Sequence, residues 1–168
     1  SDFYAKNMAQ KYFPKIQIKE IENFYLKEQV ELVKAARTIK PRVPASNILL
    51  VMGPSKDNIE FLAIDFFMSN LQKIGLSSNS IRVRLRLHPS ESIGKYDSVI
   101  IKYSSIEFDT IKDNDLSADI AWADLVAGTF NYPMVVSLNS KIPTISIMPP
   151  KTGKCPLPHS EIIHLREL

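Results

Sequence analysis

The 168-residue sequence contains little cysteine, glycine or tryptophan: there is one cysteine, Cys155, with five glycines and one tryptophan. A single cysteine excludes a disulfide framework and a zinc site built from cysteines. No apolar run reaches the roughly 20 residues that a membrane-spanning helix needs. The longest runs, 48–53 and 142–150, have the length of strands. No secretion signal is recognisable at the N-terminus.

The composition is that of an ordinary globular chain, with 45% hydrophobic and 23% charged residues, and its length suits one domain. The net charge of +3 is too small to argue for nucleic acid as a partner. Residues 1–47 hold nine Lys or Arg and five Asp or Glu, a balance of +4, which leaves −1 for the rest. Such a flank usually forms a solvated surface but can attract membrane headgroups. We expect a cytoplasmic protein, for which this flank allows peripheral contact with the inner face of the membrane.

Two segments are distinguished by their patterns. Apolar residues recur at helical spacing over 5–12 and 26–39, with a short extended piece at 16–21 between them. Prolines 41 and 44, followed by Ser46 and Asn47, then predict a linker over 40–47. We therefore divide the chain into residues 1–47, an appendage or the end of a preceding lobe, and a main domain, 48–168. Because the first residue is serine rather than methionine, we expect the chain to be a piece of a longer protein.

The main domain alternates apolar runs with helical patterns. The predicted strands are 48–52, 81–87, 98–103, 125–127 and 142–148, with a short extended piece at 106–108. Continuous apolar runs are typical of strands buried on both faces of a parallel sheet. The alternation predicts an α/β domain: a doubly wound, mostly parallel, Rossmann-like sheet with helices on both faces. In such sheets, ligands bind outside the carboxyl ends of the strands. That rule selects five loops as candidates: 53–56, 88–92, 103–107, 128–133 and 149–154.

The most specific of these loops begins with His88 and Pro89. Proline fixes its own φ and holds the preceding residue extended, so the imidazole is placed at the tip of a strand. A histidine there can donate a hydrogen bond to a phosphate oxygen, or it can merely close a turn. Arg82, Arg84 and Arg86 precede it at a spacing of two, which puts them on one face. Arg86 is nearest the strand end and is the candidate for pairing with a phosphate, whereas the other two suit a partly exposed strand face.

A second candidate is the loop 128–133, in which Gly128 ends a strand just before a predicted helix. Unpaired N–H groups at a helix N-terminus form an anion site, and Thr129 and Asn131 add side-chain donors. The same donors can serve only as helix caps. Gly53 and Ser55 form a similar but weaker turn. No phosphate-binding P-loop, dinucleotide-binding glycine motif or metal-ligand cluster is present, so we expect neither a nicotinamide cofactor nor a metal.

Three segments taken together resemble a known family. They are Arg-Leu-His-Pro over 86–89, Ala-Asp-Leu-Val-Ala-Gly-Thr over 123–129 and Ile-Pro-Thr-Ile-Ser-Ile over 142–147. In this order they resemble the C-terminal, donor-binding half of GT-B glycosyltransferases. The resemblance covers about residues 48–150, and it is greatest to bacterial sialyltransferases and related surface-polysaccharide transferases that carry an His-Pro motif.

This resemblance implies roles for individual residues. His88 would be the catalytic contact to the donor phosphate and Pro89 its motif partner, while Gly128 and Thr129 would begin the phosphate loop. Family members often have two Ser/Thr residues in that loop, whereas here the second polar residue is Asn131. The implied donor is a CMP-linked acidic sugar and the acceptor a glycan. If this chain corresponds only to the C-terminal half, the catalytic base would lie in the N-terminal half of such an enzyme. Within this chain, the candidate region for the base is 103–109, where Glu107 follows a predicted strand.

Two functions from other classes remain open. One is an epimerase or hydrolase of UDP-sugars on the same fold, which a preference for UDP over CMP would favour. The other is a non-catalytic module that binds a partner through its sheet edge or basic flank, which a failure to bind any nucleotide would favour.

Overall fold

The computed structural model describes residues 3–37, 46–53 and 58–168. The described chain contains a six-stranded, entirely parallel sheet with the strand order β3-β2-β1-β4-β5-β6. The strands are β1 (Ser46–Val51), β2 (Ile81–Arg86), β3 (Glu107–Ile111), β4 (Leu125–Gly128), β5 (Thr144–Ser146) and β6 (Ile163–His164). The helices are α1 (Phe3–Tyr12), α2 (Phe24–Arg37), α3 (Ile59–Ser69), α4 (Asp97–Lys102), α5 (Leu116–Trp122) and α6 (Tyr132–Asn139), with short 3₁₀ turns at Leu71–Ile74, Ser78–Ser80 and Leu165–Glu167. None of the described helices is both long and apolar enough to cross a bilayer.

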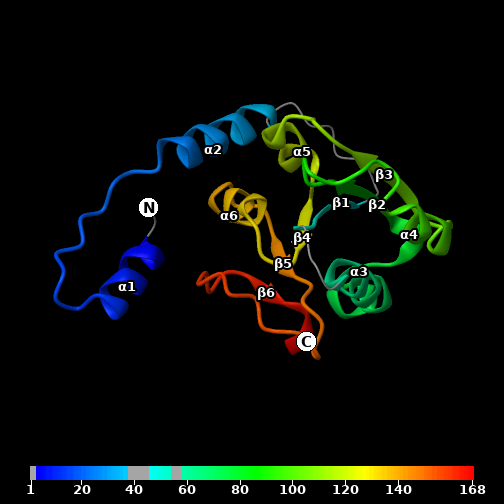
Figure 1. The fold of residues 1–168 in the computed structure, drawn as a ribbon. Helices are drawn as coiled ribbons and strands as arrows, with labels where there is room; N and C mark the ends of the chain where they lie inside the picture. Colours follow the sequence, from blue (N-terminus) through cyan, green and yellow to red (C-terminus); the bar gives the residue numbers. More distant parts are fainter. Residues whose placement is uncertain (1–2, 38–45, 54–57) are drawn as a thin grey trace.

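Helices cover both faces of the sheet (Figure 1). The reason is visible in β1, where every residue from Asn47 to Val51 is buried. Ile48 and Leu50 belong to the core cluster that includes side chains of α3 and α4. Leu49 and Val51 belong to the cluster that includes side chains of α2, α5 and α6. Because successive side chains of a strand point to opposite faces, one apolar run supplies two cores, and the predicted doubly wound α/β fold is confirmed.

Strand β2 has the alternation that its sequence predicts. Ile81, Val83 and Leu85 are buried and lie in the core cluster of α3 and α4. The three intervening arginines are half-buried. Two of them, Arg84 and Arg86, pair with Asp119 of α5, so the arginine face of β2 is the α5 face.

The predicted strand at 98–103 is wrong, because these residues form α4. Tyr96 and Val99 are buried, Tyr103 is half-buried, and this spacing of three and four is helical. A short apolar run fits a strand or a helix equally well by composition. The third strand of the sheet is instead β3, whose first four residues are exposed or half-buried. The strand predicted at 142–148 is reduced to β5, and the two-residue β6 was not predicted.

The N-terminal segment contains the two predicted helices, but residues 14–23 form no strand. Ser46 and Asn47 belong to β1 rather than to a linker, because both pair with β2. The rest of the predicted linker, 40–45, lies outside the described residues. Helix α2 packs on the sheet domain through Val33, which has no exposed surface, whereas α1 stands apart from the sheet (Figure 1).

Candidate functional site

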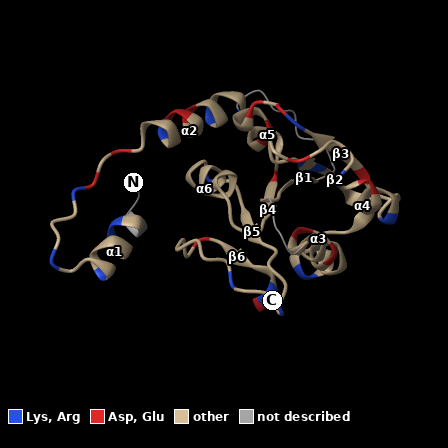
Figure 2. Ribbon diagram, in the orientation of Figure 1, with Lys and Arg blue, Asp and Glu red and all other residues tan. Residues whose placement is uncertain are grey.

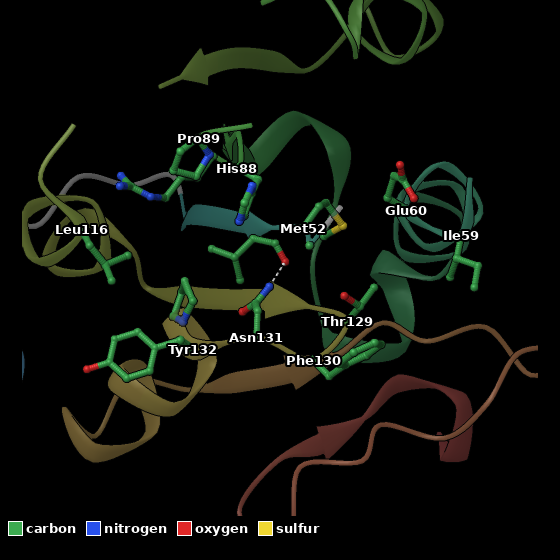
Figure 3. A pocket seen from close by; sticks show the side chains of 14 residues that line it. Met52, Ile59, Glu60, His88, Pro89, Leu116, Thr129, Phe130, Asn131 and Tyr132 are labelled. Atoms are coloured by element: carbon green, nitrogen blue, oxygen red, sulfur yellow. Dashed lines mark hydrogen bonds between the residues drawn. The ribbon is translucent and has the colours of Figure 1, made fainter. Parts of the chain in front are cut away.

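A cavity of about 540 Å³ opens at the carboxyl ends of β1, β2 and β4. Its volume is within the range of roughly 300–1,000 Å³ that small-molecule sites occupy. Figure 3 shows side chains converging on it from both sides of the strand ends. Its lining comprises Val51, Met52, Gly53, Ile59, Glu60, Arg86, His88, Pro89, Leu116, Thr129, Phe130, Asn131, Tyr132 and Pro133.

The strand order explains why the cavity lies there. β1 is flanked by β2 on one side and β4 on the other, so the order of strands reverses at β1. The helices that follow β1 and β4 pack on opposite faces of the sheet, which leaves a crevice between their N-termini. This switch point is where open α/β sheets bind their ligands.

His88 lies at this crevice and projects its ring into the cavity (Figure 3). The backbone N–H of Ser90 points at Nδ1 of the ring at 3.2 Å, and the Ser90 hydroxyl lies 2.7 Å from the same nitrogen. A backbone N–H can only donate, so in the neutral ring Nδ1 is the acceptor and Nε2 carries the hydrogen. The backbone N–H of His88 donates to Oε2 of Glu91 at 2.8 Å, which fixes the loop. His88 therefore presents an N–H donor to whatever occupies the cavity.

The loop after β4 lines the opposite wall. The Thr129 side chain is 6% exposed, and the described residues offer its hydroxyl no hydrogen-bond partner. Asn131 caps α6: its Oδ1 accepts from the Met134 N–H at 3.4 Å, while its Nδ2 donates to the Val51 carbonyl at 2.7 Å. Asn131, predicted as a phosphate donor, thus already links the end of β1 to the start of α6. In the described structure, Thr129 and Tyr132 are the polar side chains of the loop whose hydroxyls have no partner. The Tyr132 hydroxyl points away from His88 (Figure 3), so Thr129 is the one left for a ligand beside His88.

Gly128 allows the close approach of β4 to β1. A Cβ built at this position would lie 2.7 Å from the Val51 carbonyl oxygen and 2.8 Å from Val51 Cγ2. Real Cβ atoms do not pack that closely against backbone. The glycine of the Gly-Thr pair is therefore explained by strand packing, which in turn places Thr129 at the cavity.

Arg86 lines the cavity but is held by the protein. Its guanidinium pairs with the Oδ2 of Asp119, and its Nη2 donates to the Asn114 carbonyl at 2.8 Å. Asp119 is 1% exposed. Burial raises the pKa of Asp119 above its ordinary value, and the attraction of Arg86 and Arg84 offsets this only in part. The charge of Arg86 is thus opposed by a carboxylate beside it, so we regard it as part of the wall.

A buried ionic cluster supports the wall formed by α3. The Lys95 ammonium donates to Glu60 Oε1 and to Glu91 Oε1, each at 2.6 Å. Both carboxylates are buried, at 1% and 6% exposed for Glu60 and Glu91. Burial acts to lower the pKa of Lys95, but the hydrogen bonds that its ammonium donates to Glu60 and Glu91 outweigh it, so this pKa is raised. Since Glu91 also holds the backbone of His88, the cluster connects α3 with the histidine loop.

Of the other predicted site residues, Gly53 and Pro89 line the cavity, and Ser55 lies outside the described residues. Glu107 does not line it. It is the first residue of β3 and pairs in register with Arg82 near the start of β2, so it lies at the amino edge of the sheet. The misplaced third strand caused this error, because 103–107 precedes a strand instead of following one. The loop 149–154, after β5, also contributes no lining residue.

Four further lining residues were not named from the sequence. Phe130 and Tyr132 lie within the predicted candidate loop 128–133, whereas Ile59 and Glu60 lie outside all five candidate loops. A signal existed for Glu60: it stands three and four residues before Ala63 and Ile64, on the buried face of α3. A carboxylate on an apolar face is an informative departure from the pattern.

Charge is distributed unevenly around the cavity. Figure 2 shows β4 and α6 without Lys, Arg, Asp or Glu. Among the described residues of β4, α6 and the loop between them, an anion would therefore meet backbone N–H groups, hydroxyls and the helix dipole of α6.

A scan against protein-family models found no match. A search of curated proteins found none either. Among solved structures, the chain is similar to Thermosulfurimonas dismutans KpsC, described as a beta Kdo 2,4 transferase, with 8% sequence identity and a TM-score of 0.44. The alignment covers 86% of this chain and 52% of that one, so this chain spans about half the length of that protein.

Proposed function

We propose that the chain is the donor-binding unit of a glycosyltransferase that acts in bacterial surface-glycan synthesis. It binds a nucleotide-activated sugar in the cavity at the ends of β1, β2 and β4, with the donor phosphate between His88 and Thr129. The preferred donor is a CMP-linked acidic sugar, a choice that rests on the resemblance of residues 86–89 to the His-Pro motif. The acceptor is a glycan, and the protein works in the cytoplasm with peripheral contact to the inner face of the membrane.

One observation carries this proposal. His88 follows β2 and Thr129 follows β4, 41 residues apart in the sequence, yet both line a single cavity at the switch point. His88 offers an Nε2–H donor, and Thr129 offers a hydroxyl beside the N-terminus of α6. Donors arranged on one small volume favour an anion, and the phosphate of a nucleotide is an anion of the right size.

The chemistry follows from where charge develops. When the bond between the sugar and the phosphate breaks, negative charge grows on the phosphate oxygens. Donors already aimed at those oxygens stabilise the developing charge without reorganising, and each such donor is typically worth roughly 3–4 kcal/mol of barrier. We assign this role to His88 Nε2–H and the Thr129 hydroxyl. The first turn of α6 adds little, because Pro133 has no N–H and Asn131 already caps the N–H of Met134. Arg86 contributes less because Asp119 opposes its charge.

The test is calorimetric titration of CMP, UDP and GDP into the wild-type protein, His88→Ala and His164→Ala. We expect CMP to bind most tightly, and we expect His88→Ala to weaken it about 10- to 100-fold, the value of one hydrogen bond to a charged group. His164 lies on β6 and does not line the cavity, so His164→Ala should bind CMP like the wild type.

Other results would redirect the assignment. Equal CMP affinity in the wild type and His88→Ala would remove His88 from the site. A preference for UDP would favour an epimerase or hydrolase of UDP-sugars. Failure of the wild type to bind any nucleotide would overturn the proposal in favour of a non-catalytic module.

A further inference from the structure

Glu60 has a feature that the phosphate site does not use. Its side chain lines the cavity and is 1% exposed. One carboxylate oxygen, Oε1, accepts a hydrogen bond from Lys95 at 2.6 Å. The other, Oε2, is fully buried and has no hydrogen-bond partner among the described residues. A buried carboxylate oxygen without a donor is costly, so its retention beside a cavity needs an explanation.

The surrounding charges keep this oxygen a strong acceptor. Within the part of the chain that the structure describes, Glu60 and Glu91 share one ammonium, that of Lys95. This group of three carries one excess negative charge when all three are ionised. The raised pKa of Lys95 keeps the ammonium protonated at neutral pH, although burial alone would lower that pKa. The Tyr96 hydroxyl donates its hydrogen bond to Glu91 at 3.2 Å, so it provides no donor for Glu60 Oε2.

A purely structural role explains only one of the two carboxylate oxygens of Glu60. Holding Lys95 requires Oε1, and Glu91 already provides that ammonium with a second carboxylate. Nothing in the described structure requires Oε2. Figure 3 shows Glu60 and His88 bordering the same space, so a ligand between them meets an acceptor on the α3 side and a donor on the β2 side.

We propose that Glu60 Oε2 accepts a hydrogen bond from a hydroxyl group of the bound nucleotide sugar, and that Glu60 thereby selects ligands that carry a hydroxyl at a fixed distance from their phosphate. The inference rests on the proposed function. The cavity then has two ends: His88 and Thr129 take the phosphate, and Glu60 takes a hydroxyl. A carboxylate repels phosphate and attracts hydroxyl groups, so the two ends also fix the direction in which the ligand lies.

The hydroxyl can belong to the nucleoside or to the transferred sugar. CMP carries only the former, whereas CMP-N-acetylneuraminic acid carries both. Comparing these two ligands identifies the source, and inorganic phosphate reports on the phosphate end alone.

The experiment measures binding of all three ligands to the wild type, Glu60→Gln, Glu60→Asp and Asp65→Asn. Glu60→Gln keeps an oxygen for Lys95 but replaces an acceptor with an amide. Glu60→Asp keeps the negative charge but shortens the side chain by one methylene, so the carboxylate lies farther from the ligand. Asp65→Asn is the matched control, because Asp65 lies on the same helix, outside the cavity, and bonds Lys102 and Tyr103 instead.

We expect both Glu60 variants to weaken CMP, or CMP-N-acetylneuraminic acid alone, about 10- to 100-fold. Loss with CMP assigns the hydroxyl to the nucleoside, and loss with the sugar nucleotide alone assigns it to the sugar. Phosphate should bind Glu60→Gln as well as the wild type or more tightly, which also shows that the variant is folded. Asp65→Asn should match the wild type throughout.

Wild-type affinity for both nucleotides in either folded Glu60 variant would overturn the inference. If His88→Ala still weakened CMP in that case, the proposed function would stand without it. If the wild type bound no nucleotide, both would fall together.

Discussion

At the residue scale, the cavity depends on contacts between positions that are distant in the sequence. Gly128 touches Val51, and Asn131 bonds the carbonyl of the same residue across 80 positions. The strand-end rule predicted where His88 and Thr129 would lie, because it needs only the local pattern of each strand. It did not predict the partners of Asn131 and Arg86, because these depend on which strands and helices become neighbours.

Replacing Gly128 tests the close approach of β1 and β4. We expect Gly128→Ala to lower the free energy of unfolding by about 1–3 kcal/mol, the usual cost of overpacking, because its Cβ meets backbone that cannot rotate away. Urea denaturation measures the change. Gly153→Ala is the control, since a Cβ there has nothing within 4 Å, and it should change stability by less than about 0.5 kcal/mol. Equal stability of both variants would show that the strands separate at no cost.

At the element scale, apolar runs were read correctly where both faces of a strand are buried. β1 and β4 were placed from such runs. The pattern failed at 98–103, where a short apolar segment packs one helical face through Val99 and leaves Ile101 exposed. Because of that mistake, Glu107 was predicted at the carboxyl edge of the sheet, near the site, although it lies at the amino edge.

Lys95 joins α3 to the loop before α4, and we expect this link to weaken at alkaline pH. The pKa of Lys95 is raised above its ordinary value of 10.5 because its hydrogen bonds to carboxylates outweigh burial. A raised pKa stabilises the fold fully below the unfolded-state pKa, and the contribution is lost as the pH rises through the folded-state value. Lys95→Met should therefore lower the free energy of unfolding by roughly 3 kcal/mol at neutral pH, because it removes the positive charge that two buried carboxylates share.

Urea denaturation of the wild type and Lys95→Met from about pH 7 to about pH 12 measures this contribution. The difference should be constant up to about pH 10 and shrink above it. Lys73→Met, at an exposed position, should have little effect at any pH. A difference that grows with rising pH would contradict the account.

At the scale of the whole molecule, the fold class followed from alternating strands and helices, whereas the strand order did not. Adjacency of β1 and β4 requires pairing over more than 70 residues, which no local pattern records. Helix α2 also contacts the main domain near the cavity: Tyr25 stacks on Tyr132 with ring centroids 5.5 Å apart, and Tyr132 lines the cavity.

Two N-terminal truncations separate α1 from α2. The chain 23–168 keeps Asn23, whose Oδ1 accepts from the Leu26 N–H at 3.0 Å at the start of α2. We expect its free energy of unfolding to stay within about 1 kcal/mol of the full chain, because α1 stands apart from the sheet. The chain 46–168 should lose about 3 kcal/mol or more, since Val30 and Val33 leave the core. A large loss in the first truncation would show that α1 supports the domain.

The central claim is that the donor phosphate binds where β1, β2 and β4 end, and amide NMR of the ¹⁵N-labelled chain titrated with CMP tests it most directly. The account predicts that the largest shift changes occur at Gly53, His88 and Thr129, with little change at Arg82 and Glu107 on the opposite edge of the sheet. Shift changes confined to that opposite edge, or none at saturating CMP, would contradict it.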